Sequence, residues 1–132
     1  MKRVYFCPKC ETTLNPNVKV VLVAANGDKR GLVLMSPQPG NYQIFTSDNL
    51  EIKKGDLLEI FCPVCGANLR SHVDRHLAEI SFRTSQGEEG RVDFSRVAGE
   101  HATYIITAEE IRSYGENAGV YGARNFFGEG AF

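Results

Sequence analysis

The 132-residue sequence lacks any apolar run of the roughly 18 to 20 residues that a membrane-spanning helix needs. It also lacks an excess of charge of either sign, since 15 Lys and Arg residues stand against 16 Asp and Glu residues. A net charge of −1 disfavours a general nucleic-acid coat protein, which depends on a basic surface. Tryptophan is absent, but 42% of the residues are hydrophobic, so the chain can bury one compact core.

The N-terminal segment does not show the pattern expected of a secretory leader. The segment Met1–Cys7 carries basic residues as a leader does, but Pro8, Lys9 and Glu11 interrupt it before an apolar stretch can form. We therefore expect a cytoplasmic protein. In that reducing compartment, paired cysteines more often serve as metal ligands or redox thiols than as structural disulfides.

Four cysteines in two pairs form the strongest motif of the sequence. They make two C-P-x-C units, Cys7-Pro8-Lys9-Cys10 and Cys62-Pro63-Val64-Cys65, separated by 51 residues. Each such turn places two sulfurs on one side of a tight bend, and two facing bends make a tetrahedral thiolate cage that suits Zn²⁺ or iron. Gly66 can adopt the positive φ that completes the second turn, whereas Glu11, at the equivalent position of the first, must accept backbone strain or relax the turn.

The two knuckles, CPKC and CPVCG, resemble those of zinc-ribbon and rubredoxin-like domains. The resemblance covers about a dozen residues and implies that one metal is held between the knuckles, with Cys7, Cys10, Cys62 and Cys65 as its ligands. It implies no particular activity, because such domains serve in enzymes, transcription machinery and scaffolds. Two features depart from the resemblance: the long β-rich insert between the knuckles, and the absence of the tryptophan that is common in rubredoxin cores.

Other uses of the cysteines stay open at the level of sequence. Each pair can form a disulfide or remain as buried free thiols. A thioredoxin-like role needs a single C-x-x-C that opens a helix in a βαβ setting, and only the tetrapeptide fits. An iron site that carries electrons uses the same ligands as zinc. We expect closed structural zinc, which has no open coordination position for chemistry and therefore contributes to folding.

Histidines and acids offer weaker candidates. His72 and His76, four residues apart, form an alternative Cys₂His₂ set with the second cysteine pair, but the alternation that starts at His76 favours a strand. Glu100 and His101, with Asp93 or Ser95, form a conceivable catalytic set, but no nucleophile motif surrounds it. We therefore assign no catalytic residue, and the sequence contains no nucleotide-binding motif.

Hydrophobic patterning predicts a mainly β protein with a split Cys₄ site that brackets an antiparallel β segment. The expected strands cover 18–24, 31–35, 42–46, 57–61, 76–83, 91–97 and 102–106. Asn26-Gly27 predicts a tight hairpin turn, and 87–90 a hairpin loop. The capping-box pattern Thr107-Ala108-Glu109-Glu110 predicts one short helix that ends at Gly115. We identify no internal repeat beyond the cysteine pairs.

These expected elements divide the chain into three parts. Residues 1–71 form a metal-knuckle β segment, 72–114 a small β unit with the short helix, and 115–132 a Gly-rich tail that we expect to be flexible. All six lysines lie in the first part, whose nine basic and six acidic residues give a charge of +3. The remaining residues carry −4, so the two parts can attract one another.

Together, these features predict a zinc-binding, non-enzymatic module that acts as an interaction or scaffold domain. The near-neutral charge favours a protein partner or a second copy of the chain. A nucleic-acid surface is a weaker prediction, based on Lys2, Arg3 and Lys9 beside the first knuckle, with Tyr5 and Phe6 available for stacking. The alternative function is a rubredoxin-like iron electron-transfer or thiol redox protein that uses the same four cysteines.

Overall fold

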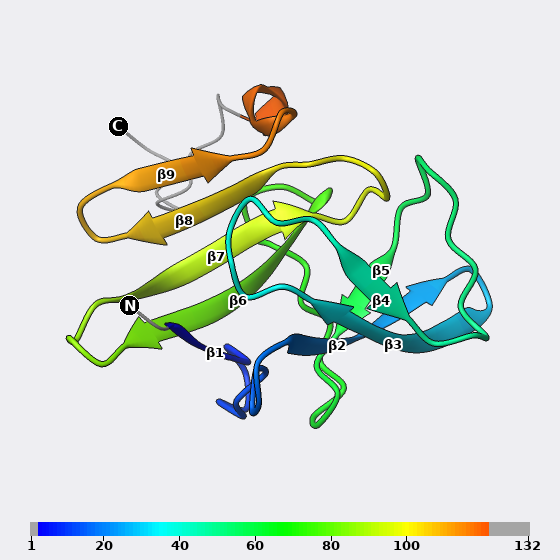
Figure 1. Cartoon of the computed structure of the whole chain (residues 1–132), viewed down its shortest axis with the longest axis horizontal. Coiled ribbons are helices and arrows are strands. Elements are labelled where there is room, and N and C mark those ends of the chain that lie inside the picture. Colours follow the sequence, from blue (N-terminus) through cyan, green and yellow to red (C-terminus); the bar gives the residue numbers. More distant parts are fainter. Residues whose placement is uncertain (1–2, 122–132) are drawn as a thin grey trace.

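The computed structural model describes residues 3–121, which fold into two antiparallel β-sheets and one short 3-10 helix (Figure 1). The strands are β1 (Arg3–Phe6), β2 (Val20–Asn26), β3 (Lys29–Met35), β4 (Ile44–Thr46), β5 (Glu59–Phe61), β6 (Leu77–Thr84), β7 (Glu89–Ser95), β8 (Thr103–Thr107) and β9 (Ile111–Tyr114). The mainly β prediction is confirmed. Within the described residues, no helix has the length and apolarity needed to cross a membrane.

The two sheets exchange a strand. The four-stranded sheet has the order β4-β3-β2-β5, and the five-stranded sheet has the order β1-β6-β7-β8-β9. Strand β1 therefore pairs with β6, far along the chain, while β5 returns to pair with β2. Strand β1 was not predicted, because four residues are too few to show an alternating pattern.

This exchange reveals an internal repeat larger than the cysteine pairs. In each half of the chain a short strand leads into a knuckle, and three consecutive antiparallel strands follow it. The first half contains β1 to β4, and the second contains β5 to β8. Each short strand joins the sheet of the other half, in the same position beside its first long strand. The expectation of no further repeat was therefore wrong, because the repeat lies in the topology more than in the residues.

Turn chemistry fixes the first hairpin. The ladder between β2 and β3 closes with Asn26 opposite Lys29, so Gly27 and Asp28 form a two-residue loop. Gly27 has φ +63°, as a glycine at the first loop position of a tight hairpin requires. The predicted turn is confirmed, with the loop shifted by one residue so that Asn26 keeps its strand conformation.

The core lies between the inner faces of the two sheets. Along β2, Val20, Leu22 and Ala24 are buried, while the alternate residues face outward, as the two-residue period of a strand dictates. Ile80 and Phe82 of β6 meet them from the other sheet. A second cluster on the outer face of the five-stranded sheet packs Tyr104 of β8 against the helix η1 (Ala118–Tyr121). Residues 122–132, which belong to the predicted tail, lie outside the described part of the chain.

The predicted helix after Thr107 is wrong. Residues 107–110 form a tight turn, and the chain returns as β9, paired with β8. The capping chemistry itself is present, because the Thr107 hydroxyl accepts hydrogen bonds from the N–H groups of Glu109 (3.4 Å) and Glu110 (3.2 Å). The open edge of β8 then offers a full ladder of hydrogen bonds to Ile111–Tyr114, which outweighs the local preference for a helix.

Candidate metal centre

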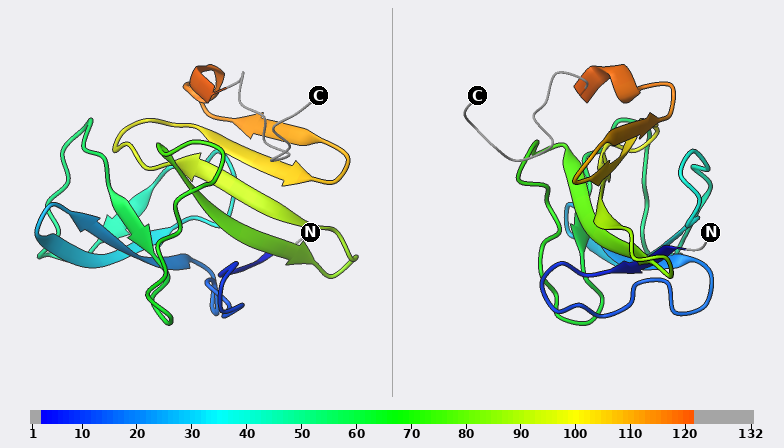
Figure 2. Two further views of the ribbon diagram at one scale, coloured as in Figure 1. Left: turned by 180° about the vertical axis from the view of Figure 1, so that it is seen from behind. Right: turned by 90° about the vertical axis from the view of Figure 1, so that its left-hand side faces the viewer.

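The two knuckles project from the same side of the molecule, at the ends of the exchanged strands (Figures 1 and 2). The first knuckle follows β1, the edge strand of the five-stranded sheet, and the second follows β5, the edge strand of the other sheet. Because each of these strands joins the sheet of the opposite half, the fold brings Cys7 and Cys62 together although they are 55 positions apart.

The four sulfurs form a cage of the size that a metal ion needs. The Cys7 and Cys65 sulfurs are 3.8 Å apart, as are those of Cys10 and Cys62, and all four lie within 4.8 Å of one another. A tetrahedral ion with metal–sulfur bonds of about 2.3 Å places its ligands about 3.8 Å apart. A disulfide needs about 2.05 Å, so the geometry is that of four separate thiol ligands. The structure thus brings together all four predicted ligands as a possible metal site.

Backbone N–H groups converge on the first sulfur of each knuckle in the same way. The Cys7 sulfur accepts from the N–H groups of Lys9 (3.3 Å) and Cys10 (3.5 Å). The Cys62 sulfur accepts from those of Val64 (3.4 Å) and Cys65 (3.5 Å). Such N–H donors hold a thiolate in place and stabilise its negative charge, so the knuckles are built for charged sulfur.

The residue after each knuckle adopts the left-handed conformation. Gly66 has φ +74°, and its N–H donates to the Cys62 carbonyl at 3.0 Å. Glu11 has φ +63° and makes the equivalent bond to the Cys7 carbonyl at 2.9 Å. Glu11 is therefore held in a conformation that costs a residue with a side chain about 1 to 2 kcal/mol. Of the two outcomes predicted for Glu11, the structure shows backbone strain rather than a relaxed turn.

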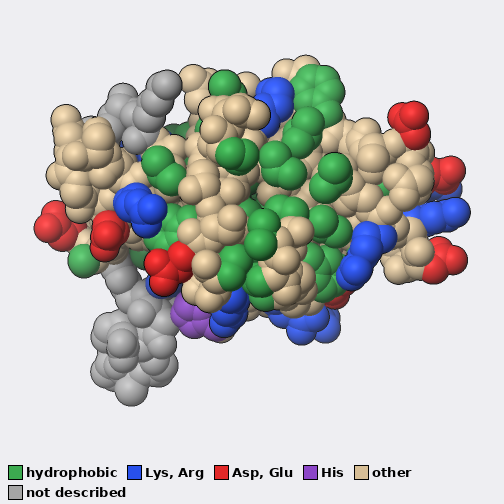
Figure 3. All heavy atoms as spheres, turned by 90° about the horizontal axis from the view of Figure 1, so that it is seen from below, with side chains coloured by type: hydrophobic (Ala, Val, Ile, Leu, Met, Phe, Trp, Pro, Cys, Tyr) green, Lys and Arg blue, Asp and Glu red, His purple; other side chains and the backbone are tan. Residues whose placement is uncertain are grey.

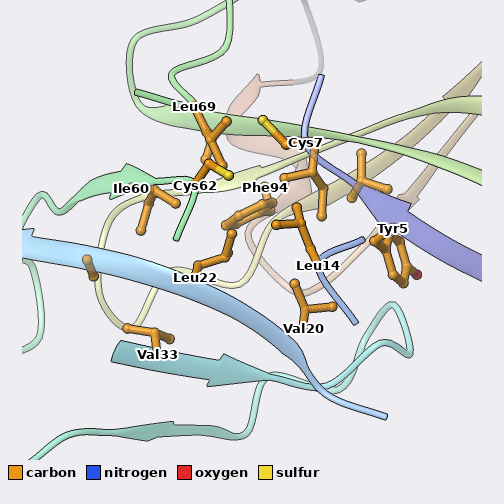
Figure 4. Close-up of a cluster of buried hydrophobic side chains, with 14 of the residues drawn as sticks. Tyr5, Cys7, Leu14, Val20, Leu22, Val33, Ile60, Cys62, Leu69 and Phe94 are labelled. Carbon is orange, nitrogen blue, oxygen red and sulfur yellow. The ribbon is translucent and has the colours of Figure 1, made fainter. Parts of the chain in front are cut away.

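Two leucines anchor the knuckles to the core. Leu14 and Leu69 each follow the second cysteine of a knuckle by four positions, and they are 1% and 2% exposed. Each donates its N–H back across the knuckle, Leu14 to the Tyr5 carbonyl (2.7 Å) and Leu69 to the Ile60 carbonyl (2.8 Å). Figure 4 shows both leucines beside the buried cysteines Cys7 and Cys62. Packing therefore fixes the inner half of the cage, while Cys10 and Cys65 lie at the surface.

The electrostatics of the cluster favour a cation at its centre. Burial raises the pKa of Cys62, but the N–H donors of its knuckle and the neighbouring thiols outweigh burial and lower that pKa to about 7. Burial raises the pKa of Cys7. The Thr12 N–H lowers the pKa of Cys10, but desolvation and the three other cysteines together raise it to about 11. Four negative sulfurs this close together repel one another, so a dication is needed to hold them all as thiolates.

The alternative histidine ligands are used elsewhere. The His72 Nδ1 lies 3.0 Å from the Glu79 carboxylate, and the His76 Nδ1 lies 3.1 Å from the Asp74 carboxylate. The group of potential ligands found among residues 3–121 contains the four cysteines and neither histidine. A Cys₂His₂ site is therefore not formed.

The conceivable catalytic set is divided among separate contacts. Glu100 accepts hydrogen bonds from the hydroxyls of Ser95 and Tyr121, both at 2.6 Å. His101 stacks on Tyr42 instead, with ring centroids 4.4 Å apart. Asp93 accepts from Ser71, on another part of the sheet. No nucleophile, base and orienting acid come together from these four residues.

The basic cluster beside the first knuckle has no free tyrosine for stacking. Tyr5 is 3% exposed, and its hydroxyl donates to the Pro37 carbonyl at 2.6 Å. The Phe6 ring lies under the Arg83 guanidinium, 4.8 Å from its centroid. Tyr5, at least, is therefore unavailable to nucleic-acid bases.

A buried acid that the sequence analysis did not single out as such lies on β7. Asp93 has no exposed surface, and burial, helped by the neighbouring Glu79 carboxylate, raises its pKa to about 7. Its place in an alternating strand gave no signal, because alternation alone predicts that Asp93 faces solvent.

Comparison with models of protein families, with curated proteins and with solved structures finds no match to this chain. The geometry of the four cysteines is therefore the observation from which function has to be inferred, and it indicates metal binding.

Proposed function

We propose that Cys7, Cys10, Cys62 and Cys65 hold one Zn²⁺ in a closed structural site, as in zinc-ribbon proteins, and that the chain acts as a non-enzymatic module that binds another protein. The observation that carries the first part is the spacing of the four sulfurs, which matches the edges of a zinc tetrathiolate. Four thiolates fill the coordination shell, so the ion supports the fold rather than a reaction.

Metal analysis tests the site directly. Purified protein is expected to contain one zinc per chain and to be colourless. One iron per chain with a visible thiolate absorption would replace the proposal with rubredoxin-like electron transfer. A chain without metal would overturn the site.

A matched pair of variants tests the ligands. Cys62→Ser should lose the metal and melt at a much lower temperature, because zinc binding to such thiolates contributes about 10 to 16 kcal/mol in small peptides. Val64→Ser, on the same knuckle and 70% exposed, should keep both the metal and the melting temperature. Full metal occupancy in Cys62→Ser would contradict the assignment.

The surface that supports a protein partner is the outer face of the four-stranded sheet. The ladder places six apolar side chains on this face, and we call them the outer apolar face: Val21, Val23, Leu32, Leu34, Phe45 and Phe61. Leu32 and Phe45 are each 48% exposed. Figure 3 shows hydrophobic side chains gathered across this side of the molecule, with Lys and Arg side chains at the margin. A contiguous exposed apolar face of this kind is typical of an interaction site.

The chemistry of the face favours protein over nucleic acid. Its centre is aliphatic, and aliphatic side chains offer no ring for base stacking. Each of the two rings already has a cation over it, Lys19 at 5.1 Å from the Phe45 centroid and Arg30 at 4.6 Å from the Phe61 centroid. An apolar strip with a basic margin complements a partner segment that carries apolar and acidic residues.

The outer apolar face is tested by capture with matched variants. A protein partner should be retained by the wild type and by Val18→Glu, whose site lies outside the face and is 66% exposed. Leu32→Glu should reduce recovery of the partner at least tenfold while leaving the metal content unchanged. The purified partner should show the same difference in binding between the wild type and Leu32→Glu. Equal recovery by both variants, or recovery that nuclease abolishes, would refute a protein partner at this face.

A further inference from the structure

A hollow of about 660 Å³ lies between the inner faces of the two sheets, away from the metal cage. Its walls come from both sheets and from two loops, residues 36–43 and 96–102, that border it. The deepest wall residues keep only a few per cent of exposure, as at Val33 (4%) and Ile80 (3%). The hollow thus reaches from the solvent into the space between the two sheets.

The hollow is partly open to solvent, so it is a cleft and not an enclosed void, and its lining is mainly apolar. Small-molecule sites are likewise mainly apolar clefts of about 300 to 1,000 Å³. The volume and the mainly apolar walls therefore correspond to a binding cleft for an apolar body.

The cleft is held open by hydrogen bonds rather than by mobile side chains. The Tyr5 hydroxyl donates to the Pro37 carbonyl at 2.6 Å, which fixes one end of the 36–43 loop. At the other end, the Tyr42 hydroxyl bonds to Thr103 Oγ1 (2.9 Å) and to the Tyr114 carbonyl (3.0 Å). The loop is therefore attached to the five-stranded sheet at both ends, and the cleft is preformed.

Among residues 3–121, the charged groups along the cleft leave the ammonium group of Lys54 without an ion pair. Arg96 donates to the Leu58 carbonyl at 2.7 Å and also to the Arg75 carbonyl. The Glu100 carboxylate accepts two hydroxyls, and the His101 Nδ1 lies 3.2 Å from Glu116.

Lys54 also lines the cleft, and no ion pair is formed by its ammonium group within residues 3–121.

Gly99 places this lysine at the cleft. The Lys54 stem lies so close to Gly99 that a Cβ there would be 2.8 Å from Lys54 Cγ, and Gly99 itself has φ +82°. The Gly55 N–H and the Ala98 carbonyl, each next to one of these residues, are joined by a hydrogen bond of 2.8 Å. The two loops are therefore fastened together where the lysine stem crosses them, and the exposed Lys54 side chain borders the cleft.

We propose that this cleft binds an apolar organic acid: an alkyl or aryl body between the two sheets, with a carboxylate or similar anion on Lys54. The proposal does not depend on the metal, because none of the four cysteines lines the cleft. It does not depend on the outer apolar face either, because the cleft lies on the opposite face of the four-stranded sheet.

A fluorescent fatty acid, 11-(dansylamino)undecanoic acid, serves as the probe, with its methyl ester as the uncharged control. The zinc-loaded wild type should bind the acid saturably at one site per chain. Met35→Trp, which fills the cleft, should weaken binding at least tenfold. Leu34→Trp, its neighbour on the outer apolar face, should stay within twofold of the wild type. If Met35→Trp does not fold, Thr46→Trp makes the same test at an exposed wall position.

The anion site is tested separately. Lys54→Glu should weaken binding of the acid about tenfold and leave binding of the ester within twofold, whereas Lys53→Glu, which does not line the cleft, should change neither. Equal effects of Lys53→Glu and Lys54→Glu would refute the role of Lys54. Absence of saturable binding, or equal loss in Met35→Trp and Leu34→Trp, would refute the cleft as the site.

Discussion

The buried Asp93 allows a quantitative prediction about pH. Asp93 Oδ2 accepts a hydrogen bond from the Ser71 hydroxyl at 2.7 Å, and its Oδ1 lies 3.7 Å from Arg91 Nε. Burial is the largest influence and raises the pKa of Asp93 to about 7; the Glu79 carboxylate acts in the same direction, and Ser71 and Arg91 oppose it. In the unfolded chain an aspartate has a pKa of about 3.9.

The sign follows from proton binding. Between pH 4 and pH 7 the folded state holds a proton on Asp93 that the unfolded state has released, so raising the pH destabilises the fold. The stabilisation linked to this proton is fully present below the unfolded pKa and is lost as the pH rises through about 7. For these two pKa values, about 1.4 kcal/mol of unfolding free energy is lost between pH 6 and pH 8. Asp93→Asn cannot ionise, and its amide oxygen still accepts from Ser71, so the variant should not show this loss.

Urea unfolding in zinc-saturating buffer at pH 6, 7 and 8 measures the effect. The unfolding free energy of the wild type minus that of Asp93→Asn should fall by about 1.4 kcal/mol across this range. Asp56→Asn is the control, because the Lys53 N–H and the Asn26 amide lower the pKa of Asp56, which is then ionised in both states at every pH used. A wild-type minus Asp93→Asn difference that is constant with pH, or that grows, would refute the assignment of a raised pKa.

Three further substitutions test the structure around the four cysteines, each through the unfolding free energy of the zinc-loaded protein. Glu11→Gly should stabilise the fold by about 0.5 to 1 kcal/mol because it relieves the left-handed strain at φ +63°, and a loss of stability would show that the Glu11 side chain matters more. Leu14→Ala should cost about 2 to 5 kcal/mol, whereas Val18→Ala should be neutral, and equal effects would contradict the role of Leu14 as an anchor. Gly90→Ala should be strongly destabilising because its Cβ would lie 2.1 Å from the Ile106 carbonyl oxygen, whereas Gly119→Ala, with open space around it, should be tolerated.

Seven strands and the four candidate ligands could be predicted because their signals are local. Alternation, β-branched residues and glycine turns act over a few positions, and the ends of the predicted strands fall within about two residues of those observed. The C-P-x-C spacing likewise identifies each half of the cage. The hydrophobic pattern could not show which strands pair with each other. Strand β1 is four residues long, and it is a strand only because it forms a ladder with β6.

The error after Thr107 has the same origin. Its hydroxyl caps the next N–H groups, as the sequence indicates, and such a cap suits a helix or a turn equally well. The choice is made by the free edge of β8, which lies close by in space but is invisible in the pattern of 107–110. The cleft and the buried Asp93 were missed for a related reason, since both depend on how the two sheets face each other.

One signal in the sequence did contain the repeat. Phe-Cys-Pro-x-Cys-x₃-Leu occurs at Phe6–Leu14 and again at Phe61–Leu69, so the match extends beyond the cysteines to the anchoring leucines. Reading it as a repeated unit would have indicated that a short strand precedes each knuckle.

The exchange of strands indicates what a metal held by the four cysteines would add to the fold. Strand β5 has three residues and β1 has four, too few hydrogen bonds to hold the edge of a sheet firmly, yet each is the link between one half of the chain and the other. The knuckles begin where these two strands end, so one ion bound by both knuckles would fasten both edges at once. Without an ion, the four thiols make only weak contacts with one another. We then expect the two short strands to separate from their sheets before the longer strands do. The four cysteines therefore lie where two short strands join the halves of the chain, a position at which a structural metal would add support.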